Sequence, residues 1–233
     1  MAPPNAVVIF AKPPEPGTVK TRLIGELSPP QSAQLHRACL EDTVALADSI
    51  PGCTHWLFVA GKAEKACEFF QELHLSERWR VGVQRGRNLG ARMENAIEDL
   101  LKRGASKVVI LGTDTPWMGR QRILEALRLL DSVDIVLGPA ADGGYYLIGA
   151  HRVVPRIFRG IPWSTSQVCS ATRRALEMSH TSFRLLPRDF DLDRPEDLKK
   201  VAERLEANPT AAPALERWLR AGRISQTEPS EKD

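Results

Sequence analysis

The stretch KVVILGTDTP, residues 107–116, carries the pattern on which the fold depends. A run of β-branched and aliphatic residues, Val108 to Leu111, ends at a glycine and a polar turn, which is typical of a buried strand in a parallel sheet. Similar short runs recur along the chain, and amphipathic helical patterns separate them. Since parallel strands need a crossover helix between them, the alternation predicts one α/β domain with a mostly parallel central sheet and helices on both faces.

The same alternation of patterns predicts where each element lies. Strands are expected at Ala6 to Ala11, His55 to Ala60, Arg80 to Gln84, Lys107 to Gly112, Ile135 to Gly138, Tyr146 to Ala150 and Ser182 to Leu186. Helices are expected near Pro30 to Ser49, Lys62 to Leu73, Gly90 to Leu101, Gly119 to Leu130, Ser166 to Met178, Pro195 to Leu205 and Ala211 to Leu219. We expect a domain over residues 1–221 and a polar tail, residues 222–233, that hangs free.

Composition and charge exclude several classes of protein. The 233 residues are 42% hydrophobic and 26% charged, as in a soluble globular protein, and a formal net charge of +3 is too small a bias for a nucleic-acid binder. The longest early apolar run, Ala6 to Ala11, is too short to cross a membrane or to form a signal-peptide core. We therefore expect a cytoplasmic protein, with four cysteines that are free thiols because no C-x-x-C pair is present.

The loop after the first strand, KPPEPGTVKTRL at residues 12–23, is rich in positive charge. Lys12, Lys20, Thr21 and Arg22 lie where the carboxyl end of a strand could receive an anion. Arginine grips phosphate oxygens bidentately and lysine supplies a point charge, so the loop suits a di- or triphosphate. The alternative is a proline-rich surface loop with solvated charges.

A second candidate, QRGRNLGARM at residues 84–93, joins a strand end to a helix start. Gln84, Gly86 and Gly90 are candidate nucleotide contacts in this turn. Asn88 is placed to cap the helix, whose exposed amides would add to an anion site, although such a cap also explains the residue by itself.

Carboxylates at two places predict a divalent cation. Asp114 follows Thr113 directly after an apolar strand, where its oxygens could hold Mg²⁺ or Mn²⁺, although an Asx turn into a proline explains it as well. In the stretch DFDLD, Asp191 and Asp193 crowd like charges that a bound cation would relieve. Against this, Asp193 could simply cap the helix that follows.

The stretch GPAADGGYY, residues 138–146, links two apolar runs. Asp142 with Gly143 is a strong hairpin signal. Gly143 and Gly144 would also let the backbone approach a sugar or base closely.

These motifs, taken in order, resemble the GT-A-like superfamily of nucleotide-diphospho-sugar transferases, and within it the bacterial group known as DUF2064 or radical SAM/selenodomain-associated transferase 1. The resemblance runs from about Val7 to Leu198 and includes FAKPPEPGTVKTRL, QRGRNLGARM, GTDTP, GPAADGGYYLIG, WSTS and DFDLDRPEDL. It implies a single Rossmann-like GT-A domain that binds a nucleotide or nucleotide-sugar with a divalent metal. Asp114 resembles the family's metal aspartate after the central strand, and Asp193 or Asp191 resembles the second one.

Two reactions follow from this resemblance as expectations. The first is metal-dependent glycosyl transfer from a nucleotide-diphospho-sugar to a small acceptor, with Lys20 and Arg22 stabilising the leaving nucleotide and Asp142 as general base. The alternative is nucleotidyl transfer from an NTP to a phosphorylated small molecule with release of pyrophosphate. Glycosyltransferases of this fold usually show D-x-D after the central strand, whereas Asp114-Thr115-Pro116 offers one carboxylate. A third reading, a nucleotide sensor or RNA-binding module without turnover, is disfavoured by the near-neutral charge.

Overall fold

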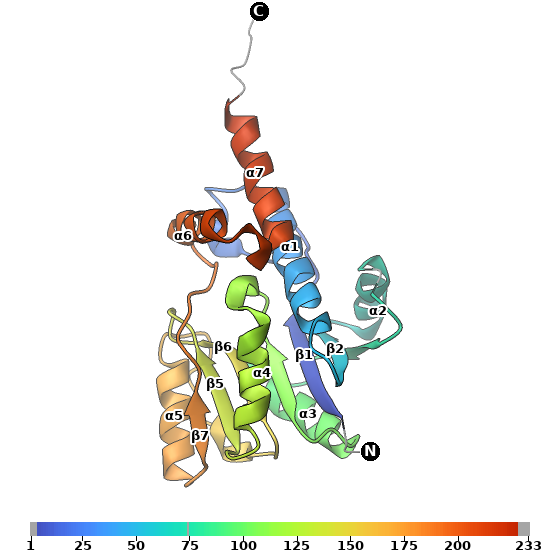
Figure 1. Cartoon of the computed structure of the whole chain (residues 1–233), viewed down its shortest axis with the longest axis vertical. Coiled ribbons are helices and arrows are strands. Elements are labelled where there is room, and N and C mark those ends of the chain that lie inside the picture. The colour runs from blue at the N-terminus through green and yellow to red at the C-terminus, as the bar shows by residue number, and fades with distance from the viewer. Residues whose placement is uncertain (1–3, 74, 228–233) are drawn as a thin grey trace, which may run out of the picture.

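The computed structural model describes residues 4–73 and 75–227, which form one seven-stranded sheet (Figure 1). The strands are β1 (Asn5–Ala11), β2 (Cys53–Val59), β3 (Trp79–Val83), β4 (Val108–Leu111), β5 (Ile135–Pro139), β6 (Tyr145–Ala150) and β7 (Phe183–Leu185), in the order β3-β2-β1-β4-β6-β5-β7. Among these strands only β6 runs against the others, because it pairs antiparallel with both β4 and β5. The mostly parallel α/β sheet predicted from the sequence is confirmed.

The helices lie on both faces of the sheet and beyond the carboxyl ends of its parallel strands. They are α1 (Pro29–Asp48), α2 (Ala63–Glu72), α3 (Leu89–Lys102), α4 (Arg120–Leu129), α5 (Val168–Met178), α6 (Pro195–Ala207) and α7 (Pro213–Thr227). Figure 1 shows α4 in front of the sheet and α6 and α7 above the carboxyl ends of the parallel strands. This end of the sheet is where ligands bind in open α/β folds.

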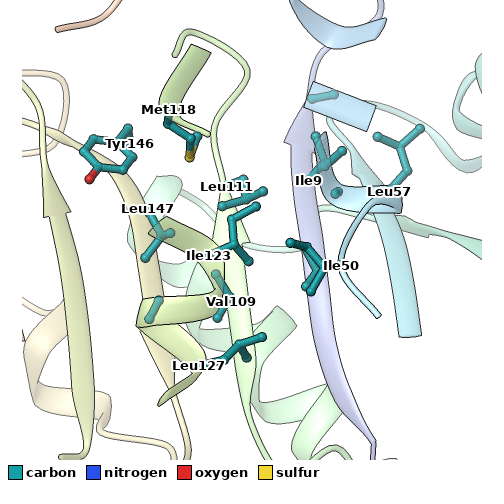
Figure 2. Close-up of a cluster of buried hydrophobic side chains, with 14 of the residues drawn as sticks. Ile9, Ile50, Leu57, Val109, Leu111, Met118, Ile123, Leu127, Tyr146 and Leu147 are labelled. Carbon is teal, nitrogen blue, oxygen red and sulfur yellow. The ribbon is translucent and has the colours of Figure 1, made fainter. Parts of the chain in front are cut away.

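Alternation along the central strands divides the core into two layers. Val7 and Ile9 of β1 pack with α1, α2 and α4, whereas Ala6 and Val8 point to the opposite face and pack with α3 and α5. Figure 2 shows part of the first layer, with Ile9 beside Leu57 and the side chains of α4 over β4. Because β1 and β4 are buried on both faces, their sequences read as continuous apolar runs.

A third cluster joins α1, α6 and α7. Asp42 of α1 is buried there, and its carboxylate accepts hydrogen bonds from the backbone nitrogens of Ala214 (2.9 Å) and Leu215 (2.8 Å). These amides belong to the first turn of α7 and would otherwise be unsatisfied. One buried carboxylate thus fixes the start of the last helix.

The end of the chain differs from the expectation in its boundary. The free tail was expected to begin at Gly222, but α7 runs to Thr227, so residues 222–227 are helical. Residues 228–233 lie outside the described residues. Within the described part of the chain all four cysteines are free thiols, as expected, and no helix has both the length and the apolar character needed to span a bilayer.

A buried histidine makes stability depend on pH. His55 is 3% exposed, its ring lies 5.3 Å from that of Trp79, and burial lowers its pKa below the ordinary 6.5. The unfolded chain therefore binds a proton that the folded chain resists, and stability is lost as pH falls through about 6.5.

We expect His55→Phe to reduce the loss of unfolding free energy between pH 7.5 and 5.5, since one such histidine contributes up to about 1.4 kcal/mol per pH unit. Urea unfolding at both pH values measures this, and His180→Asn, at an exposed histidine, is the matched control. An unchanged pH dependence in His55→Phe would contradict the assignment.

Candidate functional site

Two adjoining cavities open at the carboxyl ends of the strands, and Asp114 lies between them. The first has a volume of about 460 Å³ and the second about 490 Å³. The first is lined by Phe10, Ala11, Lys12, Val19, Lys20, His36, Gln84, Asn88, Arg92, Thr113 and Asp193. The second is lined by Arg22, Thr115, Asp142, Gly144, Tyr145, Tyr146, Trp163, Thr165, Ser166, Val168, Asp191 and Arg194. Both share Leu89, Gly112, Asp114 and Ser164.

Lys20 reaches the junction from the loop after β1. Its backbone is left-handed, with φ 48° and ψ 36°, and its side chain is 3% exposed. The Nζ atom donates to Asp114 Oδ1 at 2.5 Å and also to the carbonyl oxygen of Leu192. Lys20 therefore joins the first loop, the end of β4 and the segment that precedes α6.

The charges of this pair support each other. Burial by itself would lower the pKa of Lys20. The neighbouring Asp114 carboxylate acts in the opposite direction, and the net effect is a raised pKa of Lys20. Burial likewise opposes ionisation of Asp114, and the Lys20 ammonium holds the pKa of that carboxyl below its usual value. Both groups are therefore charged at neutral pH.

Asp191 lies beside Asp114 because two hydrogen bonds hold its segment against the end of β4. The backbone nitrogen of Leu192 donates to the Asp114 carbonyl (2.9 Å), and the buried Thr115 donates through Oγ1 to Asp191 Oδ1 (2.6 Å). Burial, together with the charges of Asp114 and Asp142, raises the pKa of Asp191 to about 7. Three carboxylates, those of Asp114, Asp142 and Asp191, thus line the second cavity.

Asp193 does not supply the helix cap that its sequence suggested. Its carboxylate forms an ion pair with the Arg22 guanidinium. The cap expected of it is instead supplied by Asp197, which accepts hydrogen bonds from the backbone nitrogens of Asp193 (3.3 Å) and Arg194 (2.9 Å). The N-cap interpretation of Asp193 is therefore wrong. The side chain of Asp197, the third residue of the helix, accepts hydrogen bonds from the backbone that precedes the helix.

The residues present fit a divalent cation that is shared with a substrate. Within residues 4–73 and 75–227, no three histidine, cysteine or acidic side chains are grouped so that they could hold a metal by themselves. Mg²⁺, however, is commonly held by one or two carboxylates together with substrate phosphates. Asp114, at the junction of the cavities, and Asp191, which forms no ion pair among the described residues, have that character. Lys20 pairs with Asp114, as Arg22 does with Asp193.

The amide of Gln84 has one atom to offer to a ligand. Its Nε2 donates to the carbonyl oxygens of Ala11 (3.1 Å) and Phe58 (2.9 Å), which fixes the orientation of the amide and leaves Oε1 as an acceptor. Asn88, the N-cap of α3, accepts from Ala91 N through Oδ1 (2.9 Å), as expected. Gln84 and Asn88 both line the first cavity, where they could contact the edge of a base or a ribose.

A strap at residues 159–167 borders both cavities. The ring of Trp163 packs directly on Gly90, where an added Cβ would lie 2.1 Å from the ring. Gly143, at φ +92°, approaches the backbone of Ser166 so closely that a Cβ would lie 1.9 Å from its carbonyl oxygen. Gly90 and Gly143 therefore seat the strap, and they do not line either cavity.

We expect Gly143→Ala to destabilise the fold by about 2 kcal/mol or more, because the strap must move and the φ is unfavourable. Gly52→Ala is the control, since Gly52 has a similar φ of +69° in open space. Thermal unfolding of the two variants separates the clash from the backbone strain. Equal losses would show that the strap does not rest on Gly143.

The structure gathers most, but not all, of the residues predicted for the site. Lys12, Lys20, Gln84, Thr113, Asp114 and Asp193 line the first cavity, and Arg22, Asp114, Asp142, Gly144 and Asp191 line the second. Thr21 and Gly86 are exposed and line neither cavity. Asp142 also makes the predicted turn, since its Oδ1 accepts from Gly144 N (2.7 Å) between the antiparallel β5 and β6.

Sequence reasoning missed several lining residues. Arg194 and the hydroxyl residues Ser164, Thr165 and Ser166 line the second cavity, and His36 and Arg92 line the first. The stretch WSTS, residues 163–166, was a usable signal because three hydroxyls follow one another. His36 lies within α1, and no local pattern marks it.

Comparisons with known proteins agree with this architecture. The chain is 21% identical over 190 residues to a 2-phospho-L-lactate guanylyltransferase of Methanobrevibacter ruminantium, covering 78% of this chain and 79% of the relative. A Desulfovibrio desulfuricans G20 structure, provisionally assigned as a nucleotide-diphospho-sugar transferase, matches with a TM-score of 0.88 and 27% identity over 94% of this chain and 95% of that one. A cytidylyltransferase from Leptospira borgpetersenii shares the fold, with a TM-score of 0.59 and 11% identity over the full length of both chains.

These relatives confirm the GT-A-like fold and the expectation of a transferase of the nucleotidyl or glycosyl class. The family described as uncharacterized protein conserved in bacteria (DUF2064) has a model that matches residues 43–165, more than half of the chain. The chain therefore belongs to the DUF2064 family.

Proposed function

We propose that this protein is a metal-dependent nucleotidyltransferase that binds a nucleoside triphosphate in the first cavity and transfers its nucleoside monophosphate to an anionic acceptor in the second. The observation that carries the proposal is the meeting of two cavities at Asp114. Two substrates placed on either side of one carboxylate would have their reacting atoms together at the junction, which is the main requirement of a transfer reaction.

The charge of the first cavity favours a triphosphate. This cavity is lined by Lys12, Lys20 and Arg92, and the adjoining second cavity is lined by Arg22. A triphosphate carries more negative charge than the diphosphate of a sugar nucleotide, so it makes fuller use of the three cations that line this cavity. The name of the guanylyltransferase relative points to the same kind of reaction.

The second cavity suits an acceptor that carries a phosphate. Arg194 makes no ion pair among the described residues, and three successive hydroxyl residues, 164–166, line the same cavity. Guanidinium and hydroxyl groups together are a common phosphate-binding set. The same relative is named for a phosphorylated acceptor, 2-phospho-L-lactate.

In the proposed reaction, an oxygen of the acceptor phosphate attacks the α-phosphorus of the nucleotide. A new phosphorus–oxygen bond forms while the bond to the bridging oxygen breaks, and pyrophosphate leaves with that electron pair. Lys12 and Arg92 hold the leaving pyrophosphate, and Arg22 with Arg194 holds the acceptor against repulsion between the two phosphates. No proton needs to be removed from an ionised phosphate.

Asp114 and Asp191 would hold Mg²⁺ or Mn²⁺, which when bound neutralises phosphate charge and orients the α-phosphate. Gln84 and Asn88 would contact the base or ribose and so fix the distance of the α-phosphorus from the junction.

Glycosyl transfer is the second candidate, because the Desulfovibrio desulfuricans G20 structure resembles this chain over nearly its whole length. In that reaction Asp142, exposed in the second cavity, would act as general base for an acceptor hydroxyl.

A product assay separates the two reactions. The purified protein is incubated with each of the four NTPs and a panel of small organic phosphates, with Mn²⁺ or with EDTA, and pyrophosphate is measured. Acceptor-dependent pyrophosphate release that EDTA abolishes is the expected result. Release of a nucleoside diphosphate from sugar nucleotides, with no pyrophosphate from any NTP, would favour glycosyl transfer instead.

A further inference from the structure

We infer that in the ligand-free protein the Lys20 ammonium takes the place of a divalent cation on Asp114. When nucleotide binds, Lys20 leaves Asp114 for a phosphate and a divalent cation replaces it on Asp114, so that cation and nucleotide bind together. This inference rests on the proposed nucleotide site and concerns the order of binding there.

The Lys20 ammonium has the surroundings of a bound metal cation. Lys20 Nζ lies 2.5 Å from Asp114 Oδ1, and its second acceptor is the carbonyl oxygen of Leu192, so the ammonium is held by oxygen ligands of the kind that Mg²⁺ prefers. Its side chain is 3% exposed, whereas that of Asp114 is 47% exposed. The carboxylate thus remains open to the cavities while the ammonium covers it from within.

The charge balance favours exchange over simple addition or loss. Removing Lys20 alone would leave Asp114 without its ion-pair partner, next to Asp191 in the same cavity. Adding a second cation to an intact ion pair would place two cations on one carboxylate. Replacing the ammonium by a divalent cation avoids both costs.

A new partner for the displaced ammonium lies within the same cavity. Lys20 lines the first cavity together with Lys12 and Arg92, where the phosphates of the nucleotide are proposed to lie. A phosphate oxygen can replace the carboxylate as acceptor for Nζ, whereas inorganic cation alone offers Lys20 no such partner. Cation binding should therefore be weak without nucleotide and strong with it.

Lys12 provides a matched control. It lines the same cavity and is exposed, and among the described residues it makes no ion pair. A lysine that binds only phosphate should affect nucleotide affinity alone. A lysine that also substitutes for the metal should affect the two affinities in opposite directions.

The test measures two dissociation constants in the whole protein: Mn²⁺ alone, by electron paramagnetic resonance, and the NTP with the largest thermal shift, by calorimetry in EDTA. Lys20→Met should bind Mn²⁺ about tenfold more tightly and the nucleotide at least tenfold more weakly, since each tenfold change corresponds to about 1.4 kcal/mol. Lys12→Met should weaken only the nucleotide.

Other outcomes overturn the inference. An unchanged Mn²⁺ affinity in Lys20→Met would make Lys20 a phosphate ligand only, and weaker binding of both ligands would make it a structural residue. If Lys20→Met does not fold, Lys20→Gln, which keeps a hydrogen-bond donor without the charge, gives the same comparison. The Mn²⁺ measurement needs no nucleotide, so it decides the role of Lys20 even if the proposed nucleotidyl transfer fails.

Discussion

Replacing Asp114 by asparagine is expected to lower metal-dependent turnover by about 10³-fold, the order of effect seen when one charge-stabilising group is removed from an active site. The substitution keeps the size of the side chain and removes the charge at the junction of the two cavities. Steady-state pyrophosphate release, compared with the unaltered protein at saturating Mn²⁺, measures the effect.

The same variant leaves the buried Lys20 ammonium without its partner, which costs about 3 kcal/mol. We expect the fold to be retained with a lower melting temperature, which circular dichroism checks. Asp99→Asn is the control, because Asp99 pairs with Arg85 on the surface of α3 and is expected to leave turnover unchanged. Undiminished turnover in folded Asp114→Asn would reject the active site described above.

Replacements of Asp191 and of Asp193 are expected to differ sharply in their effect on turnover. Asp191→Asn should reduce turnover by about 10²-fold, because Asp191 lies in the second cavity beside Asp114 and forms no ion pair within the described part of the chain. Asp193→Asn should reduce it less than tenfold, because the Arg22 guanidinium already compensates Asp193.

Turnover of these two variants, measured as a function of Mn²⁺ concentration, also locates the metal. Asp191→Asn should need much more Mn²⁺ for half-maximal rate, whereas Asp193→Asn should need about as much as the unaltered protein. The reverse order would assign the second metal ligand to Asp193, as the resemblance of the motif first allowed.

Local sequence patterns predict the strands well because burial on both faces leaves a signal within each strand. The runs at β1 and β4 are apolar without interruption, and the structure places both at the centre of the sheet. The direction of β6 was less accessible: Asp142 and Gly143 predicted a hairpin, but its insertion between β4 and β5 depends on contacts across the sheet. The end of α7 was misplaced because the polar residues from Gly222 onward indicate a free tail, whereas the helix continues to Thr227.

The site was predictable where a functional residue comes directly after a strand in the sequence. Asp114, Lys12 and Gln84 stand at the ends of β4, β1 and β3, and the parallel sheet brings these ends together. The pairing of Lys20 with Asp114 and that of Arg22 with Asp193 join residues 94 and 171 positions apart, for which no local pattern exists. The sequence therefore indicated which groups were available, and only the fold shows which carboxylates are already compensated.

Nucleotide, cation and acidic side chains are proposed to share one centre at Asp114. Crystals grown with Mn²⁺ and the best-binding NTP, and measured for the anomalous signal of manganese, test it directly. We expect a manganese peak in contact with Asp114 and Asp191, with the phosphates bound by Lys12 and Arg92 and with Lys20 moved from Asp114 to a phosphate. Nucleotide bound elsewhere, or manganese away from Asp114, would contradict the account.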